Sequence, residues 1–187
     1  GRNVHPGSAK NIMKNAVLIG HELQSMLPQD ETPANTEGYE GFFHLDSFNG
    51  NVEEVQMSYI IRDFDLTSLN ARKSLIADAV KEMNKKYGEG TVSAELKDQY
   101  LNMKEKIEPV MHIVNSAKLA MEQAGVKPLI RPIRGGTDGS RLSYMGLPTP
   151  NIFTGGENFH GRFEYIPTFA MEKAVEVILK IVEIYSK

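Results

Sequence analysis

Arg134 and the glycine-rich run that follows it form one segment that could do chemistry. The run is Gly135-Gly136-Thr137-Asp138-Gly139, where a short apolar segment gives way to a predicted helix. An arginine fork and free backbone N–H groups at such a turn suit a carboxylate or a phosphate. The same spacing also fits a plain glycine-rich turn in which Arg134 pairs with Asp138. The run is no nucleotide-binding fingerprint, because neither GxGxxG nor GxxxxGK[ST] is present.

His160 lies in a second glycine-rich loop, over residues 155–161, at the C-terminal end of a predicted strand. Open α/β sheets place ligand sites at such strand ends. Imidazole is also the commonest neutral metal ligand. A lone loop histidine is more often solvated or hydrogen-bonded, and one histidine does not make a metal site. The spacing alone leaves both interpretations open.

Two further residues are ambiguous in the same way. His5 precedes Pro6-Gly7 at a predicted turn into a helix, where a histidine can simply stabilise the turn. Arg62 ends an alternating apolar segment and points away from the apolar face. Its neighbours Asp63 and Asp65 could pair with it as ordinary strand-end charges.

Other catalytic patterns are not present in the sequence. There is no HExxH and no Ser-His-Asp set with its strand-turn-helix context. His21 and His112 fall in predicted helices and His44 in a predicted strand, each without a second ligand at ligand spacing. We expect these three histidines to be structural or surface residues.

The first half of the chain must position His5 and Arg62. Its apolar periodicity predicts helix, strand, strand, helix and strand, in that order, over residues 8–26, 42–48, 52–64, 69–87 and 91–101. An exposed loop over 27–41 joins the first helix to the first strand, and Asn49-Gly50 suits a tight hairpin turn. With one more strand from before Gly1 or from its first residues, this order is a ferredoxin-like βαββαβ fold whose first strand is truncated.

The second half must position Arg134 and His160. Its pattern predicts helices over residues 110–124 and 135–145, the second opened by a glycine-rich turn. They alternate with short apolar strands over 129–133 and 150–153, and a final helix follows Pro167. Such alternation indicates an α/β layer with parallel strands. Sheets of this kind need helices on both faces, so this half looks incomplete. The predicted fold class is therefore α/β with an α+β first domain.

Composition excludes several classes of protein. The chain has 187 residues, a formal net charge of −3 and a pI near 6, so it has no long-range attraction for nucleic acid or an anionic membrane. It has no cysteine, which excludes disulfides and thiolate metal sites. No apolar run reaches the roughly 20 residues of a membrane span, and no signal-peptide pattern opens the chain. We expect a cytoplasmic protein.

Several segments together resemble the M20 family of metallopeptidases, and within it the aminopeptidases that act on tripeptides. The matching segments run the length of the chain in the family's order: VHPGSAKN, TEGYEGF, YIIRDFD, PIRGGTDG, MGLP, NIFTGG and FHG. HPG and GGTDG are widespread in the family, whereas EGYEGF, YIIRDFD and PIRGGTDG point to the tripeptide enzymes.

The resemblance implies a role for each candidate residue. His160 is the last metal ligand of a two-zinc site, and Arg134 grips the C-terminal carboxylate of the substrate. His5 reaches the active site of the partner subunit and stabilises the tetrahedral oxyanion as a catalytic residue. Arg62 and Asn102 are weaker candidates for substrate binding.

The resemblance also implies what this sequence lacks. The family's remaining metal ligands and its general base match nothing here, so we expect a fragment that starts within the protein and is inactive alone. It would comprise a lid and dimerisation domain, residues 1–100, and the C-terminal part of a catalytic domain, residues 101–187. A homodimer through the lid is expected. The alternatives are a lid and dimerisation module without catalysis, or a related M20 dipeptidase or amidohydrolase.

Overall fold

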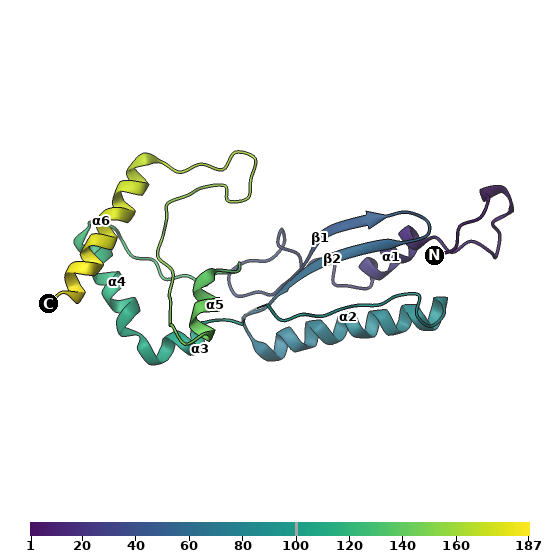
Figure 1. The fold of residues 1–187 in the computed structure, drawn as a ribbon, viewed down its shortest axis with the longest axis horizontal. Coiled ribbons are helices and arrows are strands. Elements are labelled where there is room, and N and C mark those ends of the chain that lie inside the picture. Colours follow the sequence, from purple (N-terminus) through teal and green to yellow (C-terminus); the bar gives the residue numbers. More distant parts are fainter. Residues whose placement is uncertain (100) are drawn as a thin grey trace. The chain divides into compact units, whose positions relative to one another are not determined.

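The structure, a computed structural model, describes residues 1–99 and 101–187 and forms two compact units, Gly1–Lys97 and Asp98–Lys187. The predicted domain boundary falls at Tyr100, which lies outside the described residues. Helices and an antiparallel pair of strands are both present, so the predicted mixed α/β class is confirmed (Figure 1). The two units are described separately below.

The N-terminal unit, residues 1–97, is a hairpin with two helices on one face. Its elements are a 3₁₀ turn η1 (Pro6–Ser8), α1 (Ala16–Ser25), β1 (Phe42–Gly50), β2 (Val55–Arg62) and α2 (Leu66–Tyr87). Both helices contact β2. Phe43, Ile76 and Leu27 form the buried core of this unit, with Tyr59 and Ile61 packed against them. Burial raises the pKa of Tyr59 to about 12.

A β-bulge at Asp46 keeps the apolar side chains of β1 on the helix-facing side. Leu45 pairs with Tyr59 and Ser47 with Ser58, so Asp46 is the extra residue. Leu45 and Phe48 are three residues apart, and a regular strand would place them on opposite faces. The bulge corrects this phase, and Phe48 then lies beside Gly20 of α1.

The first helix begins eight residues later than the sequence pattern predicts. Asn11 has a left-handed φ of 60°, and the backbone of Lys14 exchanges two hydrogen bonds with Arg2, which interrupts any helix through this segment. The side chain of Asn15 accepts hydrogen bonds from the N–H groups of Val17 and Leu18 and caps α1 instead. The predicted helix over 8–26 is therefore a 3₁₀ turn, a loop and a shorter helix.

The hairpin is confirmed, but its turn lies further along than predicted. The strands extend through the pair Gly50 and Val55, and the loop is 51–54, closed by the side chain of Asn51. The predicted strand over 91–101 is not a strand in its described part. The side chain of Asn84 on α2 bonds both the N–H and the C=O of Val92, so this segment pairs with a helix side chain and not with the sheet.

Arg72 of α2 joins the loop over 27–41 to the end of β2. Its guanidinium donates to Asp63 at 2.9 Å and to Glu31, and it lies 5.2 Å from the ring centroid of Phe43. Burial by itself lowers the pKa of Arg72, but the hydrogen bonds to the two carboxylates raise it above the ordinary value. A Cβ on Gly41 would lie 2.3 Å from the Asp63 carboxylate, so only glycine fits where the loop crosses this cluster.

We expect Arg72→Ala to lower the free energy of unfolding by about 2–4 kcal/mol, because it leaves the nearly buried carboxylate of Asp63 without its cation. Chemical denaturation of the 187-residue chain measures this, and amide hydrogen exchange locates the loss in the N-terminal unit. Lys81→Ala, an exposed change on the same helix, is the control and should shift unfolding by no more than about 0.5 kcal/mol. Equal effects of the two changes would contradict a structural role for the Arg72 cluster.

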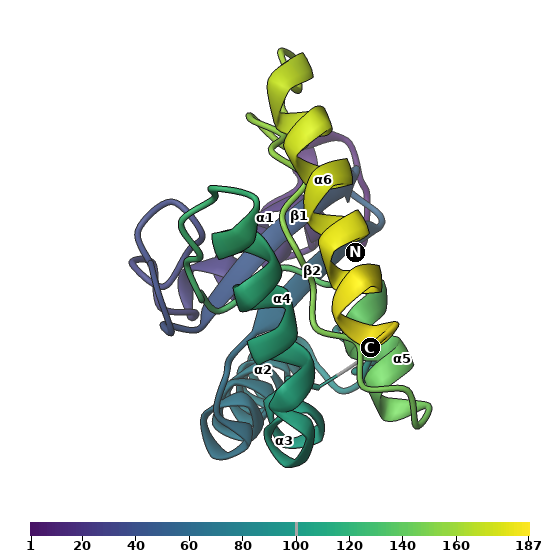
Figure 2. The ribbon, with the colours of Figure 1, turned by 90° about the vertical axis from the view of Figure 1, so that its left-hand side faces the viewer.

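The C-terminal unit, residues 98–187, is built on two packed helices. Its elements are α3 (Lys104–Ile107), η2 (Glu108–Val110), α4 (His112–Gln123), α5 (Asp138–Tyr144) and α6 (Thr168–Tyr185). Helices α4 and α6 lie alongside each other (Figure 2), and their buried contact is Ala120, Ala124 and Val177. The strands predicted over 129–133 and 150–153 are wrong as assignments, because neither segment has a hydrogen-bonded strand neighbour among the described residues.

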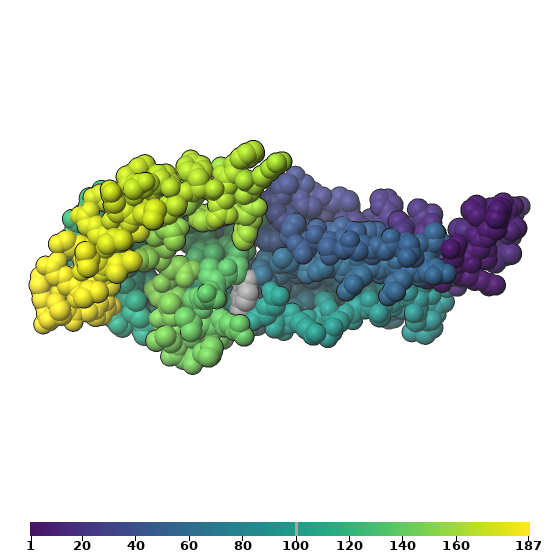
Figure 3. Space-filling model, turned by 45° about the horizontal axis from the view of Figure 1, so that its top comes forward, coloured from purple at the N-terminus to yellow at the C-terminus, as the bar shows by residue number. Residues whose placement is uncertain are grey.

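One side of α6 is covered and the other is exposed. Ala170 and Val177 are buried, whereas Phe169 is 70% exposed and Leu179 64%. In Figure 3 this helix, in yellow, lies on the surface of the C-terminal unit. Ile178 is half exposed, because α6 packs on α4 along one side. Among the described residues, no helix combines the length and the apolar character of a bilayer span.

Candidate functional site

The segment after Arg134 is held tightly by the chain that follows it. Thr137 caps α5 through its hydroxyl, which accepts from the N–H of Ser140. The hydroxyl of Ser143 donates to the carbonyl of Gly139 at 2.7 Å and accepts from the N–H of Thr149 at 2.9 Å. A Cβ on Gly139 would lie 2.4 Å from the carbonyl oxygen of Thr149, so the close approach requires glycine there. Residues 137–139 of the glycine-rich run therefore form a platform that hydrogen bonds and close packing hold in place.

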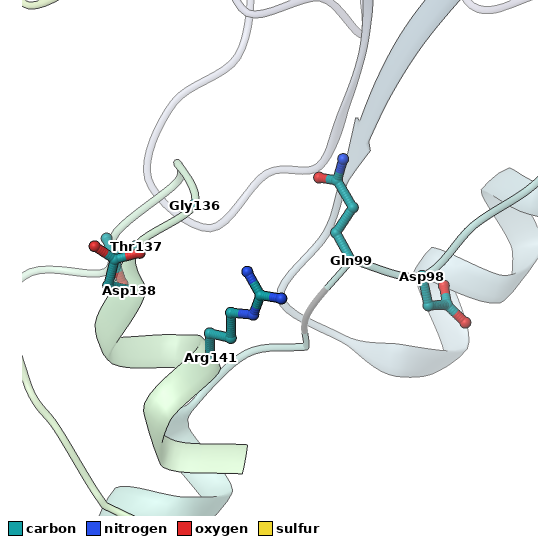
Figure 4. Close-up of a pocket in the computed structure, with 6 residues that line it drawn as sticks. All are labelled: Asp98, Gln99, Gly136, Thr137, Asp138 and Arg141. Carbon is teal, nitrogen blue, oxygen red and sulfur yellow. The ribbon is translucent and has the colours of Figure 1, made fainter. Parts of the chain in front are cut away.

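An open pocket of about 740 Å³ lies beside this platform (Figure 4). Arg141 extends its guanidinium from α5 into the space beside Gln99. The pocket is lined mostly by polar groups, namely Asp98, Gln99, Gly136, Thr137, Asp138 and Arg141. One guanidinium, one amide and two carboxylates can hold a small ligand that carries both charges, such as a zwitterionic amino acid or short peptide.

Arg134 itself is half-buried, with its Nε inside the protein. It directly precedes the platform but is not among the residues that line the pocket. The structure thus places the predicted anion-binding arginine next to a polar pocket on the same segment.

His160 sits on a loop that is closed at its base and braced at its tip. Glu157 and Tyr165 exchange two backbone hydrogen bonds of 2.9 and 3.2 Å. Asn158 and His160 have left-handed φ angles of 57° and 63°, which residues other than glycine adopt rarely. The carboxylate of Glu164 accepts the backbone N–H of His160 at 2.9 Å. The imidazole is exposed on an ordered turn.

The two candidates of the N-terminal unit are His5 and Arg62, which lie far apart in its sequence. His5 precedes η1, and its Nδ1 accepts the N–H of Gly7 at 3.1 Å, so it does cap a turn. Arg62 is the last residue of β2 and is half-buried. Its acidic neighbours have other partners as well, because Asp63 pairs with Arg72 and Asp65 caps α2 at Ser68.

The side chain and the carbonyl of Asn102 both accept hydrogen bonds near the start of α3. Its side chain accepts the N–H of Lys104 at 3.0 Å, and its carbonyl accepts the hydroxyl of Tyr144 at 3.0 Å. Burial, with a hydrogen bond from the hydroxyl to Glu105, raises the pKa of Tyr144 to about 12. Asn102 thereby ties α3 to the C-terminal end of α5.

The described part of the chain contains no group of three or more His, Asp or Glu side chains able to hold a metal ion. His160 is therefore a single donor here. Zinc in proteins takes at least three protein ligands, so the described residues do not fit a complete zinc site.

The sequence pattern singled out neither Arg141 nor Gln99, nor the hydrogen bond from the N–H of His160 to Glu164. Arg141 could have been found, because it follows Asp138 by three residues on a predicted helix and must share its face. Gln99 and Glu164 depend on loop conformation, for which the sequence carries no periodic signal. A turn-stabilising His5 is one of the two interpretations given for that residue, and the bond from the N–H of Gly7 agrees with it.

Comparison with protein families gives a match over residues 1–91, to the peptidase dimerisation domain of the M20 peptidases. Peptidase T of Clostridium novyi is 64% identical over all 187 residues, and so is peptidase T of Desulfitobacterium hafniense. In each case the chain spans 46% of the relative's length.

Two solved structures share the fold. The aminopeptidase PepT of Bacillus cereus superimposes with a TM-score of 0.63 at 20% identity, over 98% of this chain and 49% of its own. A tripeptidase of Staphylococcus aureus gives 0.64 at 17% identity, over 97% and 48%. At these sequence identities, the two structures are evidence of the fold alone.

Proposed function

We propose that this chain is part of a tripeptide aminopeptidase, because residues 1–91 match the peptidase dimerisation domain of the M20 peptidases and the whole chain is similar to peptidase T. Such an enzyme releases the N-terminal residue of a tripeptide. The observation that carries the proposal is the 64% identity, which extends through both units and not only through the dimerisation domain. Residues 1–100 would be the lid and dimerisation domain, and 101–187 part of the catalytic domain.

We propose that Arg134 binds the C-terminal carboxylate of the peptide. A guanidinium can donate two parallel hydrogen bonds to a carboxylate, which a lysine cannot do in the same geometry. The platform directly after Arg134 supports this role. An arginine held in one position can bind the C-terminal carboxylate only of a peptide of matching length, which favours a short peptide. Arg62 and Asn102 are secondary candidates for contacts to the substrate.

We propose that His5 stabilises the oxyanion that forms when the scissile carbonyl is attacked. Hydrogen-bond donors aimed at such a charge supply a large part of the rate in acyl transfer. His5 is exposed on a short turn, so its ring is available to another molecule. The proposed partner is a second copy of the protein, in a homodimer formed through the dimerisation domain.

We propose zinc as the metal of the complete enzyme, with His160 as one ligand. A pair of zinc ions would activate a water molecule and polarise the carbonyl of the peptide. The braced turn at His160 supports a ligand role, because an ordered loop holds the imidazole at little entropic cost. The remaining ligands would have to come from outside the described residues.

The proposal is tested with the complete protein on three substrates. We expect metal-dependent release of the N-terminal residue from a tripeptide, and slower cleavage, by about 100-fold or more, of its N-acetylated form and of a dipeptide. Preference for the dipeptide or the N-acetylated peptide would favour a related M20 dipeptidase or amidohydrolase. No hydrolysis by a folded, zinc-loaded dimer would favour a binding module.

A cytoplasmic location is proposed with this function, since free short peptides arise where proteins are degraded.

A further inference from the structure

The imidazole of His5 is fastened to the turn that follows it. The N–H of Gly7 donates to Nδ1 of His5 at 3.1 Å, and the N–H of Ser8 donates to the His5 carbonyl at 3.0 Å. Pro6, which has no N–H of its own, opens the 3₁₀ turn between them with a fixed φ. The ring therefore takes the place that an Asn or Ser side chain occupies at other helix starts.

This hydrogen bond determines which ring nitrogen carries the proton. A nitrogen that accepts a hydrogen bond has its lone pair free, and in neutral imidazole the proton is then on the other nitrogen. We propose that the Gly7 amide is a positioning group that holds His5 as the Nε2–H tautomer. The exposed nitrogen is then always a hydrogen-bond donor.

The catalytic consequence rests on the function proposed above. An oxyanion is stabilised by a donor and repelled by a lone pair, so only the Nε2–H tautomer can serve. In serine proteases, a histidine in the wrong tautomer lowers kcat about 10⁴-fold. A turn that holds the ring as the Nε2–H tautomer before the substrate binds avoids this loss of kcat.

Glycine at position 7 also leaves room for the ring of His5. A Cβ there would lie 3.1 Å from both Cε1 and Nδ1 of the ring. An alanine would push the ring away from the N–H that holds it. Gly7→Ala is thus a variant that weakens the bond and leaves the histidine in place.

The first experiment reads the tautomer in the 187-residue chain by two-bond ¹H–¹⁵N correlation of the imidazole rings above pH 8. We expect Nδ1 of His5 to give the signal of an unprotonated nitrogen and Nε2 that of a protonated one. In Gly7→Ala, His5 should move toward the tautomer mixture of His21, an exposed histidine that serves as the internal control. A His5 signal equal to that of His21 in the unmodified chain would overturn the proposal.

The second experiment compares His5→Asn and His5→Gln in the complete enzyme. Asparagine can accept the Gly7 N–H but has no donor at the place of Nε2, whereas the amide of glutamine reaches that place. We expect His5→Asn to lower kcat by about 100-fold or more with little change in KM, and His5→Gln to retain more activity. Amide exchange of Gly7 should be little changed in His5→Asn and become faster in His5→Gln.

The two experiments separate the two claims. A fixed tautomer together with an unchanged kcat in His5→Asn would leave the positioning intact and remove the oxyanion role from the proposed function. A lower kcat in His5→Asn together with a mixture of tautomers at His5 would instead keep the oxyanion role and overturn the positioning by Gly7.

Discussion

The purified 187-residue chain should release no amino acid from a tripeptide above the buffer rate, even when zinc is added. Among the described residues, His160 on its braced loop is the one proposed zinc ligand, and no group of three side chains is able to hold a metal ion. A catalytic zinc needs three protein ligands and an open position, and a pair of zinc ions needs more. Without the metal, neither the activated water nor the polarised carbonyl is available.

The measurement is N-terminal residue release followed by amino-acid analysis, with zinc content determined on the same desalted sample. We expect much less than one zinc per chain, and an intact mass near 20.9 kDa. The complete enzyme is the positive control, and amide exchange of the N-terminal unit shows that the chain is folded. Hydrolysis that a chelator abolishes would contradict the prediction and would mean that this chain assembles a metal site by itself.

Arg134→Ala in the complete enzyme should lower kcat/KM for tripeptides by about 30- to 3,000-fold. The range corresponds to roughly 2–5 kcal/mol, the usual loss when one partner of a close, desolvated charge pair is removed. Arg134 is half-buried and directly precedes a segment that hydrogen bonds hold in place. Arg134→Lys should recover only part of the activity, because an ammonium group cannot make the paired contact.

The control distinguishes a role in binding the carboxylate from general damage. A tripeptide with a C-terminal amide has no carboxylate, so it should be a poor substrate and should be almost insensitive to Arg134→Ala. Arg131→Ala removes an exposed positive charge three residues earlier and should have little effect on either substrate. Equal losses for the acid and the amide substrate would rule out the proposed contact.

The parts of the fold that depend on local pattern could be predicted from the sequence. The hairpin follows from alternation along residues 55–61, and α2 follows from helical spacing between Asp65, which caps it, and Gly88, which ends it with a φ of 106°. The helix α6 follows from its apolar stripe and from Pro167 at its start. Each of these signals lies within the element that it predicts or directly beside it.

The errors arose where distant residues decide the local structure. The long first helix was predicted because residues 12–26 have helical spacing, yet Lys14 pairs with Arg2 and Asn15 starts a new cap. The predicted strand after residue 91 has strand-like composition, but the side chain of Asn84 binds its backbone. A strand exists only when a neighbour supplies its hydrogen bonds, and no sequence pattern reports whether that neighbour is present.

The candidate site likewise combines residues that could be predicted from the sequence with contacts that could not. Arg134 and its glycine-rich run could be identified as an anion-binding segment from residue type alone, and Ser143 and Thr149 hold that segment in place. The state of the His5 ring could not be predicted, because it depends on one hydrogen bond across two residues. Roles for Arg62, Asn102 and His160 stay predictions.

The bulge in β1 also bears on how the gene can vary. Leu45 and Phe48 face the helices only because Asp46 is an extra residue in the ladder. Loss of a single codon at Asp46 or Ser47 would bring both apolar side chains to regular alternation and leave them on the same face. Loss of a codon between Phe43 and Leu45 would instead put those two side chains on opposite faces. Single-residue length changes in this hairpin should therefore concentrate at the bulge when many related genes are compared.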